Sequence, residues 1–144
     1  MSRVPMGSDG GALAMDPASN FYNDFIPQGI SADIIASLDG LTREDLDTFA
    51  ARSHERASTA WKEGRFDRTV VPVKDQNGVT LLDRDETIRP GTTVEGLSGL
   101  KPAFAMIGDQ GGFDAVAQTK YPQLERINHL HLSLIHISRC RRIE

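Results

Sequence analysis

The segment 43–63 constrains the fold of this chain most, because its sequence carries both the start and the stop of a long helix. Thr42 can act as the N-cap, and Asp45 stands at the third helical position, where its carboxylate completes a pair similar to a capping box. Gly64 follows the last helical residue and supplies the C-terminal stop. The sequence therefore predicts one long helix over residues 43–63.

The predicted helix is amphipathic, with charged side chains placed mostly away from its apolar stripe. Leu41 and Leu46 occupy the two positions of a hydrophobic staple, which fixes how the chain enters a helix. Acidic residues crowd the first turns, where negative charge suits the helix dipole. The apolar stripe comprises Leu46, Phe49, Ala50, Ala57, Ala60 and Trp61.

The chain before this helix divides into two parts. Residues 1–29 are rich in glycine and proline, which predicts an irregular segment with room for one short helix. From Ser31 onward, Ile34, Ile35 and Leu38 recur at helical spacing, and Asp39-Gly40 closes the run. A short helix is expected over residues 31–39.

After the long helix, the pattern changes to one typical of strands. The β-branched run 69–73 contains Pro72, which favours an edge strand, and residues 79–82 form a second short run. The intervening residues 75–78 place Asn-Gly at the tip of a turn, so the pair predicts a β-hairpin. Residues 108–112 are expected to be a loop.

Composition limits the classes of protein to which the chain can belong. The chain has 144 residues, a net charge of -4 and a single cysteine, which cannot form an internal disulfide. The mildly acidic balance argues against a polybasic nucleic-acid or membrane-surface protein. No run of 18 apolar residues is present. We therefore expect a cytoplasmic protein of the α/β or α+β class.

Individual motifs do not reveal a chemistry. Cys140 lies among three arginines that would favour its thiolate, yet no partnered base accompanies it. His129 and His131 could hold a metal, but no third ligand is evident, and a polar pair at a strand end is the favoured interpretation. Residues 75–78 lack the spacing of a calcium loop. His54 is expected to be solvated on the polar side of the helix.

The C-terminal residues 132–142 fit neither the composition nor the periodicity of the preceding chain. This string resembles the conceptual translation of a transposon-end sequencing adapter, so we expect the natural protein to be cut off near His131. The alternative is an ordinary basic C-terminus. The nucleotide sequence across codons 132–142 distinguishes the two, since the first requires an adapter match.

Several short motifs, taken together, resemble the thiolase family of acetyl-CoA acetyltransferases and 3-ketoacyl-CoA thiolases. The resemblance covers residues 1–131 and leaves 132–144 outside it. No single motif is unique to the family, but their order and spacing are specific. They are Ser2-Arg3-Val4-Pro5-Met6, Leu41 to Asp45, Phe49 to Ser53, Lys62 to Phe66, Val71-Pro72-Val73, Ile88 to Thr93 and Leu100 to Phe104.

The resemblance implies a fragment of the layered αβαβα thiolase fold. It corresponds to the N-terminal half, mostly the α+β loop domain that covers coenzyme A, with one long helix and a β-hairpin. Family members use a nucleophilic cysteine before the Ser2 to Pro5 motif and a histidine and second cysteine near the C-terminus. An asparagine helps to form their oxyanion hole. None of these positions lies in this chain, so no catalytic residue is assigned and the fragment itself is expected to be inactive.

Two residues are candidates for contact with coenzyme A, which would be a substrate rather than a cofactor. Arg89 matches the family arginine that lies along the nucleotide portion of coenzyme A. The alternative for Arg89 is a surface ion pair with Asp85 or Glu86. Gln28 is the second candidate: it belongs to Pro27-Gln28-Gly29, which stands where many biosynthetic members carry His-Met-Gly beside the acyl group. This departure argues against a short-chain acetoacetyl-CoA preference, and the chain looks closer to bacterial degradative thiolases, with the acyl-chain preference left open.

The resemblance also implies partners. Acyl-CoA and coenzyme A are expected, with no nucleic acid, membrane or metal, and the parent protein is expected to be a homodimer or homotetramer. The alternative function is a non-catalytic thiolase-like protein that binds acyl-CoA or lipid or acts as a scaffold. A face that normally packs on the rest of the enzyme would be exposed in a fragment, so the chain alone is expected to be partly unfolded or prone to aggregation.

Overall fold

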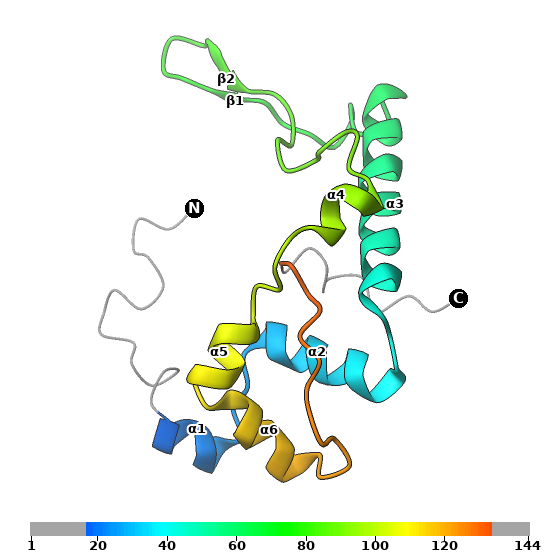
Figure 1. The fold of residues 1–144 in the computed structure, drawn as a ribbon. Coiled ribbons are helices and arrows are strands. Elements are labelled where there is room, and N and C mark those ends of the chain that lie inside the picture. Colours follow the sequence, from blue (N-terminus) through cyan, green and yellow to red (C-terminus); the bar gives the residue numbers. More distant parts are fainter. Residues whose placement is uncertain (1–16, 134–144) are drawn as a thin grey trace. The chain divides into compact units, whose positions relative to one another are not determined.

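The computed structural model of the protein describes residues 17–133. The chain divides into two compact units, each of which is described by itself. The first unit contains residues 17–46 and 100–133 of the described chain, and the second contains residues 47–99. Figure 1 shows the elements of both units.

The first unit is helical and holds the apolar core. Its helices are α1 (Pro17–Asn23), α2 (Gln28–Asp39), α5 (Ala105–Gln110) and α6 (Phe113–Lys120). The segment after α6 runs back beside α2, where the backbone N–H of Asn128 donates to Ser37 Oγ over 2.9 Å (Figure 1). The buried core therefore draws on three separate parts of the sequence: Ile30, Ile34, Phe113, Ala117 and Ile127.

Helix α2 begins three residues earlier than the periodicity predicts. Pro27 is its N-cap residue, and its carbonyl accepts backbone N–H groups from Ile30 and Ser31, each over 3.0 Å. The apolar spacing indicates only which helix face is buried. Pro27 favours a helix start, because its ring fixes φ and it has no backbone N–H that would need an acceptor. The predicted stop is confirmed, because Gly40 has a left-handed φ of 67° and follows Asp39 directly.

The long helix α3 (Arg43–Lys62) confirms the prediction to within one residue. The backbone N–H of Thr42 donates to Asp45 Oδ2 over 2.9 Å, and the Asp45 N–H donates to Thr42 Oγ1 over 3.2 Å. Hydrogen bonds from the Thr42 hydroxyl and N–H lower the pKa of Asp45, which is fully exposed. The expected capping box is therefore formed.

The predicted hairpin is present but shorter than expected. Strands β1 (Val73–Lys74) and β2 (Thr80–Leu82) pair antiparallel with an irregular register, and all five residues are exposed. The carboxylate of Asp75 accepts backbone N–H groups from Asn77 and Val79, and Gly78 has a φ of 83°. Residues 69–71 do not join the strand, because the N–H groups of Thr69 and Val70 donate to the Phe66 carbonyl.

The chain is mostly helical, with one small antiparallel sheet in its described part. The long helix and the hairpin are confirmed, but the expected loop at 108–112 is wrong at its start, because Gly108 lies inside α5 and is buried. Helix α6 and the short α4 (Val94–Ser98) were not anticipated from the sequence. Cys140 lies outside the described residues.

Candidate functional site

Arg89 opens a tight turn in the second unit. Pro90 and Gly91 follow it, and Gly91 has a φ of 81°, a left-handed value that favours glycine. The Arg89 carbonyl accepts the Thr92 hydroxyl over 2.8 Å and the Thr92 N–H over 3.4 Å. Proline at the second position and glycine at the third match the composition of a type II turn. The local sequence thus fixes the backbone that carries Arg89.

Helix α3 holds this turn in place through His54. The backbone N–H of Arg89 donates to His54 Nδ1 over 3.2 Å, across 35 positions of sequence. His54 is partly exposed, and it accepts this hydrogen bond in addition to its contact with solvent. Because Nδ1 accepts this hydrogen bond, the ring must carry its proton on Nε2 when neutral.

The Arg89 side chain is exposed and forms no ion pair with Asp85 or Glu86 in the described part of the chain. Asp85 is engaged elsewhere: its Oδ1 accepts the hydroxyl of Thr87 over 2.6 Å and the Thr87 N–H over 2.8 Å. These hydrogen bonds lower the pKa of Asp85. The surface ion pair that we considered for Arg89 is thus absent, and its guanidinium remains accessible to a ligand.

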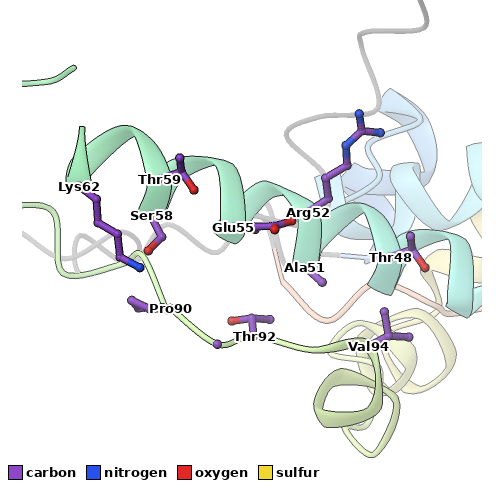
Figure 2. A pocket seen from close by; sticks show the side chains of 11 residues that line it. Thr48, Ala51, Arg52, Glu55, Ser58, Thr59, Lys62, Pro90, Thr92 and Val94 are labelled. Atoms are coloured by element: carbon purple, nitrogen blue, oxygen red, sulfur yellow. The ribbon is translucent and has the colours of Figure 1, made fainter. Parts of the chain in front are cut away.

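A groove of about 700 Å³ lies between α3 and the residues that follow Arg89 (Figure 2). Lys62 points from α3 toward Pro90, and Thr92 faces the helix across the groove. The lining side chains of α3 are Thr48, Ala51, Arg52, Glu55, Ser58, Thr59 and Lys62, and the opposite wall is Pro90, Gly91, Thr92 and Val94.

The chemistry of the groove wall suits an anionic, hydrogen-bonding ligand. Four hydroxyls and two cationic side chains line it against a single carboxylate, Glu55. Hydroxyls and cations are the groups that commonly bind phosphate oxygens. A second cavity of about 320 Å³ shares Ser58, Lys62 and Pro90 with the first and adds Arg84. Arg89 lines neither cavity, so its own contribution would come from the adjoining surface.

Gln28, the second predicted contact residue, is the first residue of α2 and is exposed. It belongs to the first unit, whereas Arg89 belongs to the second. The neighbouring Gly29 is buried, and the ring of Phe104 lies where a side chain at position 29 would have to be. The Pro27 to Gly29 motif therefore has a packing role that its sequence did not reveal.

A buried polar cluster in the first unit was missed by sequence reasoning. Asp33, on α2, is fully buried, and its Oδ1 accepts the backbone N–H groups of Leu130 and His131 over 2.9 and 3.1 Å. The same oxygen lies 2.7 Å from Nδ1 of the fully buried His131. Asp33 Oδ2 lies 2.9 Å from His129 Nδ1.

Hydrogen bonding determines the ionisation of this cluster. Burial alone would raise the pKa of Asp33, but hydrogen bonds from His131, the Leu130 N–H and His129 outweigh it and leave that pKa lowered. Burial would lower the pKa of His129, but hydrogen bonds to Asp114 and Asp33, with their negative charges, raise it. The carboxylate form of Asp33 and the charged form of His129 are thus favoured together.

The two histidines are therefore not a polar pair at a strand end, because residues 127–131 form no strand and His131 is buried. One signal in the sequence pointed to the cluster. Asp33 stands between Ile30 and Ile34 on the apolar face of α2, and a carboxylate there needs partners. Within the described residues no group of three or more His, Cys, Asp or Glu side chains is arranged to hold a metal.

Comparison with known proteins defines the family. Residues 3–114 match the thiolase N-terminal domain. Over 109 residues the chain is 44% identical to a 3-ketoacyl-CoA thiolase of Marinobacter nauticus, an alignment that covers 72% of this chain and 27% of that protein. Over 79 residues it is 51% identical to a 3-ketoacyl-CoA thiolase of Photobacterium profundum, covering 53% of this chain and 20% of that protein.

The chain belongs to the thiolase family, because the domain match covers most of its length. It spans about a fifth to a quarter of the length of these relatives, so it corresponds to a fragment of such a protein. Residues 115–144 lie outside the domain match. In residues 17–133, no helix is long and apolar enough to cross a membrane.

Proposed function

We propose that this chain is part of a thiolase that transfers acyl groups between an enzyme cysteine and coenzyme A, by thiolytic cleavage or Claisen condensation of 3-ketoacyl-CoA. The chain would supply part of the surface that binds coenzyme A within the loop domain of a layered αβαβα enzyme. It would be inactive by itself, because the resemblance assigns none of its residues to the reacting groups. We further propose that the parent is a homodimer or homotetramer.

The observation that carries this proposal is the geometry of Arg89. The Pro90-Gly91 turn fixes its backbone, His54 ties that backbone to α3, and the guanidinium is exposed without an ion pair to its acidic neighbours. A guanidinium held in this way suits a phosphate or the face of an adenine ring. The adjoining groove adds further hydroxyls and cations on the same unit.

The first test is the coding sequence on both sides of this chain. We expect a motif with a nucleophilic cysteine upstream and histidine and cysteine motifs downstream. An intact reading frame that lacks all three would overturn the enzyme proposal and favour the alternative, a non-catalytic thiolase-like protein that binds acyl-CoA or lipid or acts as a scaffold. The cytoplasmic location expected from the sequence stays a prediction.

The second test addresses Arg89 in the complete enzyme. We expect Arg89→Ala to raise KM for the coenzyme A substrate by about 10-fold, since a hydrogen bond to a charged group contributes roughly 1.5–3 kcal/mol and the site is exposed. The matched control is Arg68→Ala, which removes an exposed arginine from the same unit without changing the turn. Equal KM values for the wild type and Arg89→Ala would remove Arg89 from the site.

We also propose that residues 1–131 are the thiolase portion and that residues 132–144 derive from adapter DNA. The support is the sequence string of the tail itself. Genomic DNA that encodes residues 132–142 without an adapter match would overturn this boundary.

A further inference from the structure

The ring of His129 bridges two carboxylates from different helices of the first unit. Its Nδ1 lies 2.9 Å from Asp33 Oδ2 on α2, and its Nε2 lies 2.9 Å from Asp114 Oδ2 on α6. A neutral imidazole has one N–H, so it can donate to only one of these carboxylates. Both contacts are hydrogen bonds to ionised carboxylates only when the ring carries two protons. The geometry is therefore that of an imidazolium between two anions.

Among residues 17–133, no Lys or Arg side chain forms an ion pair with Asp33 or Asp114. From α2 the ring faces Asp33, from α6 it faces Asp114, and His131 of its own segment shares Asp33 with it. From α5 it meets the backbone of Gly108, where a side chain would overlap Asp114 and come within 2.6 Å of the His129 ring. Asp114 Oδ1 is buried and has no hydrogen-bond partner among the described residues. Asp114 therefore depends on the His129 proton.

The same histidine belongs to a segment that is fastened to α2 by its backbone. The N–H groups of Leu130 and His131 donate to Asp33, and the Asn128 N–H donates to Ser37 Oγ. The His131 carbonyl in turn accepts the Ala103 N–H over 3.0 Å. None of these bonds requires the second proton of His129. The Asp33 side chain is fully buried, whereas the Asp114 side chain is 25% exposed. A neutral ring therefore keeps its one proton on Nδ1, toward Asp33, and gives up the hydrogen bond to Asp114 on α6.

We propose that Asp33, Asp114 and His129 form a proton-controlled latch: protonated His129 forms hydrogen bonds to both α2 and α6, and neutral His129 forms one to α2 alone. The packing of Ile127 in the core with Phe113 and Ala117 of α6 is kept in both states. When Nε2 loses its proton, its lone pair faces the negatively charged carboxylate of Asp114. Asp114 Oδ2 then loses its donor, and because Asp114 Oδ1 has none among the described residues, the loss disfavours the contact between His129 and α6.

The direction of the pH dependence follows from the two histidine contacts. Because the pKa of His129 is raised, its contribution to the stability of the latch is complete below the ordinary histidine pKa of about 6.5. That contribution is lost as the pH rises through the raised value. Because the pKa of Asp33 is lowered, its contribution to the stability of the latch is complete above the ordinary aspartate pKa. That contribution is lost as the pH falls through the lowered pKa. The latch is therefore closed between these two limits.

The test follows the ring nitrogens of His129 by ¹⁵N NMR of the full 144-residue chain across this pH range, at concentrations below the onset of self-association, together with hydrogen exchange of residues 113–131. We expect both ring nitrogens to show the imidazolium signature at pH 6.5. Deprotonation should raise the exchange rate of α6 while the N–H groups of Leu130 and His131 stay protected. Asp114→Asn should lower the titration midpoint of His129 by about one pH unit.

Asp109→Asn is the matched control, because it removes an exposed carboxylate of α5 that does not contact the ring, and it should leave the midpoint unchanged. A neutral His129 ring at pH 6.5, equal midpoints for the two variants, or rapid exchange of residues 127–131 at every pH would each overturn the proposal. The exchange readout needs no enzymatic activity, so its result is independent of whether the parent is a thiolase.

Discussion

At the scale of single residues, two side chains of this protein have roles that only their surroundings define. Asp33 lies within an apolar helix face, yet four hydrogen bonds from one segment satisfy its carboxylate. His54 lies on a mostly polar helix face, yet it accepts the N–H of Arg89. In both cases the partner is distant in sequence, so the residue type alone indicates a need for a partner but not its identity.

Gly29 permits a residue-scale prediction. A methyl group there would overlap the ring of Phe104, a partly buried side chain that packs against the core of the first unit. We expect Gly29→Ala to destabilise that unit by about 1–3 kcal/mol, the usual range for overpacking. Hydrogen exchange of the α2 and α6 amides measures the loss.

Gly99→Ala is the control for this prediction, because Gly99 has a φ of -74° and open space around its Cα. Unchanged exchange of the α2 and α6 amides in Gly29→Ala would show that Phe104 moves aside at no cost.

At the scale of elements, the start of α3 is the best-defined local structure. Thr42 and Asp45 exchange hydrogen bonds over three positions, as a capping box requires. The hairpin differs from the helix start. The Asp75 carboxylate accepts two backbone N–H groups of its turn, whereas all five strand residues are exposed. Local hydrogen bonds thus define both elements, but neither strand buries a face.

The capping box predicts how α3 responds to mutation. Thr42→Ala should destabilise the first turn by about 0.5–2 kcal/mol, because one backbone donor loses its acceptor. Hydrogen exchange of the N–H groups of residues 44–46 reports this loss, and Thr42→Ser, which keeps the hydroxyl, should exchange like the wild type. Equal exchange in the alanine and serine variants would show that the hydroxyl contributes nothing.

At the scale of the whole molecule, apolar side chains are exposed on the hairpin and its approach. Val71 is 85% exposed, Leu81 is 67% exposed and Val79 is 60% exposed. An exposed, largely apolar two-stranded element is a site for pairing or packing with other chains. In a complete thiolase we expect the rest of the protein to cover this surface.

The 144-residue chain alone should therefore self-associate as its concentration rises and should unfold without a sharp cooperative transition. Light scattering and thermal denaturation measure these two properties. The variant Val79→Thr with Leu81→Thr should reduce the scattering, because threonine favours extended backbone and exposes less apolar surface. A monomer that melts in one sharp transition would contradict this expectation.

The sequence by itself determined the long helix with its cap and stop, the turn of the hairpin and the thiolase resemblance, because each rests on signals within a few neighbouring positions or on their order. Tertiary structure decided the early start of α2, the burial of Gly108 in a helix and the accessibility of Arg89. It also decided the carboxylate bridge of His129, whose contact with Asp33 spans 96 positions. Such contacts depend on how the chain returns on itself, and no local pattern specifies that return.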